Sequence, residues 1–232
     1  IRDRLMTGNG FTHNHTLSMS AGSERIRVMT SLGYLDQNGI IKNANFKRYN
    51  LRNNMDIRMN DRLNFRLDIA ATYSRRAANP YQSSVFGFMN SKDPLMLAQW
   101  SDGSYAPFTG GTVNPLPMIE QGVGGNNIRQ NGVLKASAAL EYKPVQWLTL
   151  EVKAAPQLTA VKTHRFVDLV EYHSDPYGTV SKTSNAEYNS LDETVTAAWN
   201  GYYHATAAAT RQFGGHSFKL LVGASYEEYD YY

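Results

Sequence analysis

The chain has 232 residues, enough for one large domain or two of ordinary size. It contains no cysteine, which excludes a disulfide framework, cysteine-ligated zinc and a cysteine nucleophile. The net charge of +3 comes from Lys and Arg residues that are scattered and often stand beside Asp or Glu. Nucleic-acid binders instead gather positive charge on one patch, so we expect no nucleic-acid partner.

No run of about 18 apolar residues is present, so the sequence predicts no transmembrane helix. The first residues, from Ile1 onward, carry neither a basic leader nor an apolar signal core. We therefore expect a mature, trimmed or incomplete N-terminus. The dominant signal along the rest of the chain is an alternation of apolar and polar residues with a period of two, which is typical of β-strands.

The first hairpin is predicted between residues 16 and 34. Apolar residues alternate with Thr and Ser over 16–21, and a turn follows at Gly22-Ser23. Ile26, Val28, Leu32 and Tyr34 then alternate with polar residues or glycine. Two alternating runs joined by a turn of this composition indicate an antiparallel pair of strands.

The second hairpin, over residues 48–59 and 63–74, has the longest alternation in the chain. Only Asn60-Asp61-Arg62 separates the two runs, which indicates a tight turn. Alternate side chains of a strand point to opposite faces, so each run has one apolar face, interrupted only by Asn53, and one polar face. The polar face is predicted to carry Arg48, Arg52, Asp56, Arg58, Arg66 and Asp68.

Two further hairpins are predicted in the second half of the chain. Residues 134–142 and 148–154 alternate on either side of a Pro144-Val145-Gln146 turn. Residues 203–210 and 218–227 alternate on either side of Gly214-Gly215. The sequence therefore predicts about eight strands in about four hairpins.

The connections alternate between short and long. Short turns lie near Gly22, Asp61, Pro144 and Gly214, and the links between hairpins cover residues 36–46, 75–130 and 157–193. Strict alternation places all the short turns at one end of the sheet. Bacterial outer-membrane barrels have this layout, with short periplasmic turns and long extracellular loops.

Strand length and aromatic placement favour a membrane barrel over a soluble sheet. Runs of about twelve residues exceed ordinary strands and suffice for a tilted membrane crossing. Aromatic residues near the run ends would form the interface girdles: Tyr34, Tyr49, Tyr73, Tyr142, Trp147, Tyr203 and Tyr226. Any half-buried antiparallel sheet also alternates, so a soluble β-sandwich with polar outer faces stays open at this point.

Three segments carry a family resemblance. They are Ser20-Ala-Gly-Ser-Glu24, Ser31-Leu-Gly-Tyr-Leu-Asp-Gln-Asn-Gly-Ile-Ile-Lys42 and Asn45-Phe-Lys-Arg-Tyr-Asn50. Together they resemble the SusC/RagA family of TonB-dependent outer-membrane transporters of Bacteroidetes. The middle segment is the most specific, whereas the rest of the chain fits the family by its layout.

The resemblance implies an all-β fold, in which residues 1–232 form part of a large antiparallel transmembrane barrel of roughly 22 strands. The plug domain, the segment that contacts TonB and the remaining strands would lie outside these residues. The implied function is TonB-dependent import of a glycan or peptide across the outer membrane, with a SusD-like surface lipoprotein as a lid. The alternatives are a passive porin or surface adhesin, which need the same barrel without a plug, and the soluble β-sandwich binding module.

Few residues suggest reaction chemistry. His13 and His15 stand two apart and could both face a metal, but no third ligand is near in sequence. Residues 122–125 lack the helix and the Lys-Ser/Thr of a phosphate loop. We expect no enzyme activity, no metal and no cofactor.

Two sets of residues are candidates for the functional site. The polar face of residues 48–74 would point to a wet lumen, because an Arg facing lipid costs about 2–4 kcal/mol at the membrane midplane. There it would form cross-strand ladders or contact substrate. The long link 75–130 carries Trp100, Tyr105 and Phe108, whose rings would either contact substrate or a lid protein, or pack among themselves.

Overall fold

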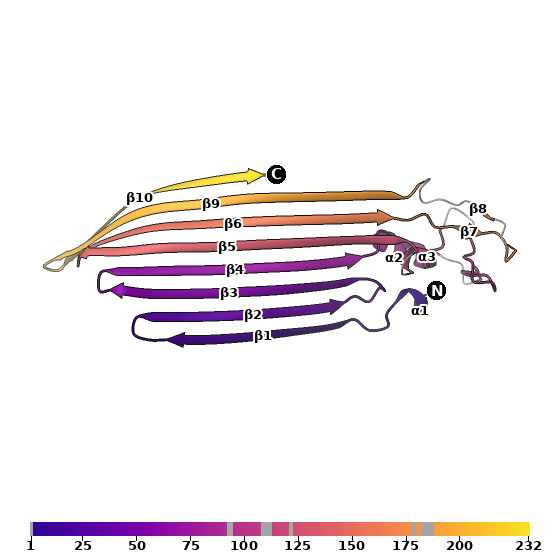
Figure 1. The fold of residues 1–232 in the computed structure, drawn as a ribbon, viewed down its shortest axis with the longest axis horizontal. Coiled ribbons are helices and arrows are strands. Elements are labelled where there is room, and N and C mark those ends of the chain that lie inside the picture. The colour runs from indigo at the N-terminus through magenta and orange to yellow at the C-terminus, as the bar shows by residue number, and fades with distance from the viewer. Residues whose placement is uncertain (1, 92–94, 108–112, 121–122, 178–179, 182–187) are drawn as a thin grey trace.

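The computed structural model describes residues 2–91, 95–107, 113–120, 123–177, 180–181 and 188–232. Its main feature is one antiparallel sheet of eight strands in the order β1-β2-β3-β4-β5-β6-β9-β10 (Figure 1). The strands are β1 (Phe11–Gly22), β2 (Ile26–Asn38), β3 (Asn45–Asn60), β4 (Leu63–Ala78), β5 (Gly125–Val145), β6 (Leu148–Val167), β9 (Ser190–Phe213) and β10 (His216–Tyr231). The predicted all-β class and the eight strands in four hairpins are confirmed, and the hairpins pair with one another in chain order.

The strands are longer than the alternation of apolar residues predicts. β5 has 21 residues and β9 has 24. The links between hairpins are correspondingly shorter than predicted and cover residues 39–44, 79–124 and 168–189. Strand pairing continues past the apolar stretch because backbone hydrogen bonds do not require apolar side chains, so a hydrophobicity pattern marks only part of each strand.

The turn predicted at Pro144 lies slightly further along the chain. β5 continues to Val145, and the two residues Gln146 and Trp147 connect it to β6. The register shifts between Tyr142 and Val145, which marks a bulge around Pro144. Proline has no backbone N–H for the ladder and is tolerated at such bulges, which explains why the strand passes through it.

The register across the sheet is staggered. The stagger is seen by following one row of register partners across the sheet and counting residues to the short-turn end of each strand. In β2 the row passes through Tyr34, eight residues from Ile26, and in β4 it passes through Tyr73, ten residues from Leu63. The same row crosses β9 at Ala197, sixteen residues from the end at Phe213. The distance from this row to the short turns therefore grows across the sheet. If the short turns all lie at the same height in a membrane, the strands must be tilted, as the strands of membrane barrels are.

A small globular cluster covers the end of the sheet where the long connections lie (Figure 1). It contains the helices α1 (Arg2–Leu5), α2 (Gln82–Asn90) and α3 (Leu116–Ile119) and the short pair β7 (Tyr172–His173) and β8 (Val180–Ser181). Its core consists of Leu5, Ile41, Val85, Leu116 and Ile119. We call this part of the molecule the loop cluster.

The large apolar side chains of the sheet are mostly exposed. Leu17 is 57% exposed, Leu220 64% and Val222 61%. Among the described residues, no second sheet is packed on the eight strands, which disfavours the soluble β-sandwich. A sheet with one uncovered apolar face needs an apolar environment, and the described part of the chain has no helix long and apolar enough to cross a membrane.

Candidate functional site: the polar face and the loop cluster

The six polar residues predicted to share a face do so. Asp56 on β3 lies directly opposite Arg66 on β4, and Asp68 lies opposite Asn54. Arg48, Arg52 and Arg58 occupy the same alternate positions of β3 as Asp56. This side of the sheet is called the polar face below, and the opposite side is called the apolar face.

Ion pairs and hydrogen bonds connect the polar face across several strands. Arg66 on β4 forms an ion pair with Glu151 on β6. Glu151 also contacts His204 on β9, with 3.1 Å between Glu151 Oε1 and His204 Nε2. The amide of Asn54 donates to Asp68 Oδ1 at 2.5 Å. Glu151 and His204 were not among the predicted site residues, although both stand at polar positions of alternating segments.

A polar hollow lies on this face near the short turns. It has a volume of about 290 Å³. Its charged lining residues are Glu24, Arg25, Arg27, Asp56, Arg58, Arg66 and Glu141. Four arginines and three carboxylates in one hollow can pair with one another or with charged groups of another protein segment.

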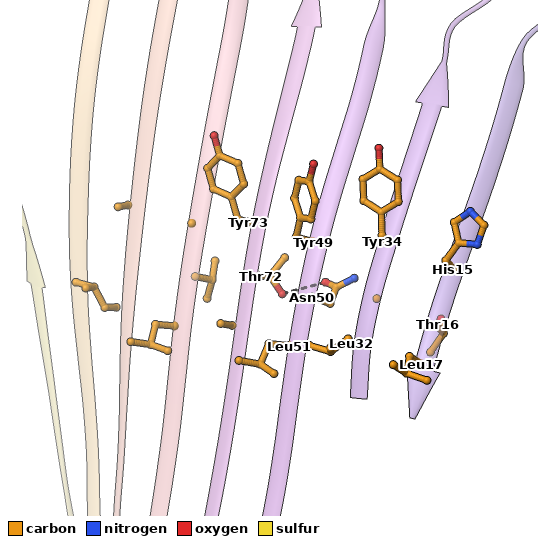
Figure 2. A pocket seen from close by; sticks show the side chains of 17 residues that line it. His15, Thr16, Leu17, Leu32, Tyr34, Tyr49, Asn50, Leu51, Thr72 and Tyr73 are labelled. Atoms are coloured by element: carbon orange, nitrogen blue, oxygen red, sulfur yellow. Dashed lines mark hydrogen bonds between the residues drawn. The ribbon is translucent and has the colours of Figure 1, made fainter. Parts of the chain in front are cut away.

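The apolar face carries a row of aromatic side chains. His15, Tyr34, Tyr49 and Tyr73 are register partners on β1 to β4. The ring centroids of Tyr34 and Tyr49 are 5.0 Å apart, and those of Tyr49 and Tyr73 are 6.4 Å apart. Figure 2 shows the three phenol oxygens pointing the same way along the strands, toward the long-connection end. We call this group the tyrosine row.

An apolar hollow of about 900 Å³ lies beside the tyrosine row (Figure 2). Leucines and small residues form much of its lining: Leu17, Leu32, Leu51, Ala71, Gly132, Leu134, Leu158 and Ala160. The hollow arises because small residues on β4, β5 and β6 stand next to bulky rings and leucines on the neighbouring strands.

Asn53, the one polar residue that interrupts the apolar face of β3, has a partner. Its amide donates to Thr30 Oγ1 on β2 at 2.8 Å. Thr30 is the register partner of Asn53, so both side chains lie on the apolar face. This hydrogen bond therefore gives the Asn53 amide a partner, and without one the amide would cost free energy in an apolar environment.

Trp100 and Tyr105 both lie in the loop cluster, and Phe108 lies outside the described residues. The indole N–H of Trp100 donates to the carbonyl oxygen of His173 at 2.7 Å. Tyr105 packs against the buried core and donates its hydroxyl to Glu120. The polar groups of both side chains are thus hydrogen-bonded inside the loop cluster, and the Trp100 hydrogen bond joins two loops that are distant in sequence.

Tyr105 belongs to a charged chain of contacts. Glu120 accepts a hydrogen bond from the Tyr105 hydroxyl through Oε2 and forms an ion pair through Oε1 with Arg4, at 2.7 Å. Burial and the hydrogen bond to Glu120 raise the pKa of Tyr105 to about 12. Tyr105 therefore stays protonated across the physiological range and acts here as a hydrogen-bond donor.

A buried asparagine, Asn114, that was not among the predicted site residues fixes the same cluster. Asn114 donates to the carbonyl oxygens of Ala98 at 2.7 Å and Ala106 at 2.8 Å, and accepts from the backbone N–H of Leu116. Its own carbonyl accepts the Tyr172 hydroxyl at 3.0 Å. The only sequence signal was Asn-Pro, which indicates a turn but not four buried contacts.

His13 and His15 lie side by side, with 3.2 Å between His13 Nδ1 and His15 Nε2. Both rings also approach Tyr34. In the described part of the chain, no group of three His, Cys, Asp or Glu residues is arranged to hold a metal.

No family model matches the chain. The chain is 26% identical over 235 residues to TonB-dependent receptor P26 of Formosa agariphila, which covers 97% of this chain and 22% of that receptor. It is 29% identical over 164 residues to TonB-dependent receptor P39 of the same organism, covering 68% of this chain and 14% of that receptor. The chain thus spans less than a quarter of the length of these relatives.

Solved structures share the fold. The RagAB peptide importer in its closed-closed state matches with a TM-score of 0.67 and 19% identity, over 94% of this chain and 24% of that chain. Its open-open state matches with a TM-score of 0.68 and 18% identity, over 95% and 24%. The chain thus resembles TonB-dependent receptors in sequence, and its fold matches a barrel segment of the SusC/RagA type.

For a SusC/RagA-type barrel segment, the open sheet is expected. β1 and β10 form the two edges of the sheet, and each would have to pair with further strands to close a barrel in lipid. The predicted resemblance to this family, the partial barrel and the layout of short turns and longer connections are confirmed. The assignment of residues 1–232 to a barrel domain and the roles of the individual site residues remain predictions.

Proposed function

We propose that this chain forms part of the wall of an outer-membrane transporter that imports a nutrient in a TonB-dependent manner. The observation that carries the proposal is the two-faced sheet. Eight long, staggered strands present a charged network on one face and an uncovered apolar surface on the other. Similarity to TonB-dependent receptors over 97% of the chain supports active import over a passive pore.

In this proposal the polar face lines the lumen. Arg48, Arg52, Asp56, Arg58, Arg66 and Asp68 would pair across strands or contact a plug that fills the barrel. The polar hollow near the short turns fits contact with a plug, because mixed charges can form charge-assisted hydrogen bonds with a second segment. The apolar face would contact outer-membrane lipid.

The loop cluster would lie on the outer side, where substrate and lid approach. Trp100, Tyr105 and Phe108 belong to the link that we propose meets the substrate or a SusD-like surface lipoprotein. The internal contacts of Trp100 and Tyr105 support a role in holding the loops in one shape for that contact. The fold neighbour is a peptide importer, and we propose a glycan or a peptide as the substrate class here.

The test uses the full-length transporter in its own outer membrane. Uptake of a labelled oligosaccharide or oligopeptide pool is measured with and without TonB, and with and without the proton-motive force. We expect uptake to require both. Uptake that persists when TonB is deleted would show a passive porin, and surface attachment without uptake would show an adhesin.

A further inference from the structure

A row of polar and charged residues lies on the apolar face, next to the tyrosine row and toward the long connections. On each of β1 to β6, this polar row lies two residues along the strand from the row that contains the tyrosines. Its members are register partners: His13, Asp36, Lys47, Arg75, Gln130 and Lys162. The row is joined to the tyrosine row by side-chain contacts. Tyr34 donates its hydroxyl to Asp36 at 2.9 Å, and Gln130 donates to the Tyr73 hydroxyl at 2.9 Å.

Lys47 and Arg75 lie directly opposite each other within this row. Like charges in directly opposite positions of a sheet repel each other. Asp36 forms an ion pair with Lys47 at 3.2 Å, on the side away from Arg75. Within the described part of the chain, Asp36 is the one carboxylate that forms an ion pair with these two cations. An anion placed between Lys47 and Arg75 would relieve their repulsion.

The apolar hollow lies next to these cations. Tyr49 and Tyr73, the neighbours of Lys47 and Arg75 along β3 and β4, form part of its wall (Figure 2). Its volume of about 900 Å³ fits parts of long hydrocarbon chains. Tyrosines with an apolar body and a polar tip mark the boundary between the hydrocarbon core and the head groups of a bilayer.

We propose that Lys47 and Arg75 bind the phosphate of one outer-leaflet lipid whose acyl chains occupy the apolar hollow. The ligand is a phosphorylated lipid with several acyl chains, because the site places two cations beside an apolar hollow at a head-group boundary. A guanidinium and an ammonium together supply a planar fork and a point charge, which suits phosphate oxygens. The proposal rests on the outward position of the long connections but not on which nutrient is transported.

The experiment uses the full-length transporter in nanodiscs of a neutral phospholipid doped with a small fraction of lipid A. Retained lipid A is counted by native mass spectrometry after detergent transfer. We expect the double variant Lys47→Ala with Arg75→Ala to reduce lipid A retention about tenfold or more, because each basic residue near an anionic head group adds to the binding free energy. Lys47→Arg with Arg75→Lys should restore most of it.

The matched control is Arg48→Ala with Arg76→Ala, one residue further along the same two strands and on the polar face. This variant should retain lipid A as the wild type does. Dephosphorylated lipid A should be retained weakly by every variant, and Ala160→Phe, which fills the hollow, should lower retention without removing a charge. Heat-modifiability on gels confirms that each barrel is folded.

Three outcomes would overturn the proposal. Equal retention by wild type and the Lys47/Arg75 variant would show that these cations bind no head group. Equal retention of dephosphorylated lipid A would show that the hollow binds acyl chains alone. Displacement of the lipid by millimolar inorganic phosphate, together with no effect of Ala160→Phe, would show a site for free phosphate. None of these outcomes depends on uptake, so a failure here is separate from a failure of the proposed import function.

Discussion

Arg66 on β4 forms an ion pair with Glu151 on β6, across the intervening strand β5. Glu141 on β5 lies directly opposite Glu151, accepts a hydrogen bond from Asn64 at 3.1 Å and forms an ion pair with Lys143 at 3.0 Å. Two carboxylates thus stand side by side on the polar face, and the cations around them offset their repulsion. His204 adds a further contact to Glu151 from β9.

Removing Arg66 should therefore destabilise the barrel. We expect Arg66→Ala to lower the free energy of unfolding by about 0.5–1 kcal/mol, because the pair is partly exposed to water. Glu151→Gln should cost a similar amount, and the double variant should cost less than the two together. Urea unfolding of the full-length barrel in liposomes measures all three. Strictly additive losses would show that the pair contributes nothing.

The orientation of the sheet predicts a labelling pattern. The side chains expected to face lipid are Leu51, Met55, Ile57, Leu63, Phe65, Leu67 and Ile69, and those expected to face the lumen are Arg52, Asp56, Arg66 and Asp68. Single cysteines give a clean signal in this segment, because it contains no other cysteine. A membrane-impermeant thiol reagent should label the second set and spare the first. Equal labelling of both sets in the folded, membrane-embedded protein would refute the orientation.

The Thr30–Asn53 hydrogen bond predicts that a single substitution destabilises the barrel more than a double substitution that removes both polar groups. Thr30→Val removes the acceptor and leaves the Asn53 amide unpaired on the apolar face, so we expect a loss of about 1–3 kcal/mol. Thr30→Val combined with Asn53→Leu removes both polar groups and should restore stability to near the wild-type value. The unfolding midpoint in liposomes tests this. A double variant as unstable as Thr30→Val would show that the amide is not the cause.

Trp100→Ala should weaken substrate uptake or lid association while barrel assembly stays normal. The substitution removes the ring and its hydrogen bond to His173, which joins two loops, and truncated aromatic anchors typically cost over 1 kcal/mol at an interface. Trp100→Phe keeps a ring but lacks the N–H, so it separates packing from hydrogen bonding. Growth on the cognate nutrient, compared at equal barrel levels, is the measurement. Wild-type growth of Trp100→Ala would limit Trp100 to local packing.

The raised pKa of Tyr105 predicts a loss of loop stability at high pH. A tyrosine whose pKa is about 12 in the folded state and about 10 when unfolded stabilises the fold fully below pH 10. That contribution is lost as the pH rises from 10 to 12. Protease sensitivity of the loop cluster should therefore increase over this range, and Tyr105→Phe should show a smaller increase. An identical pH profile for both proteins would contradict the assignment.

The sequence by itself determined the strands and their faces. Residues 48–74 illustrate why, because a period of two is a local property and a two-residue turn at Asp61-Arg62 fixes which residues face each other. The SusC/RagA resemblance was likewise carried by short, contiguous segments. Strand ends were predicted less well, since backbone pairing extends beyond the apolar positions that reveal it.

Only the tertiary structure decided the contacts between distant segments. Arg4 meets Glu120 and Arg66 meets Glu151 because of strand order, register and loop packing, not because of any local pattern. The partners of Trp100 and Tyr105, and the juxtaposition of Lys47 with Arg75 beside an apolar hollow, have the same origin. Side-chain periodicity specifies the face that a residue occupies, but the neighbours on that face depend on how strands far apart in the chain are aligned.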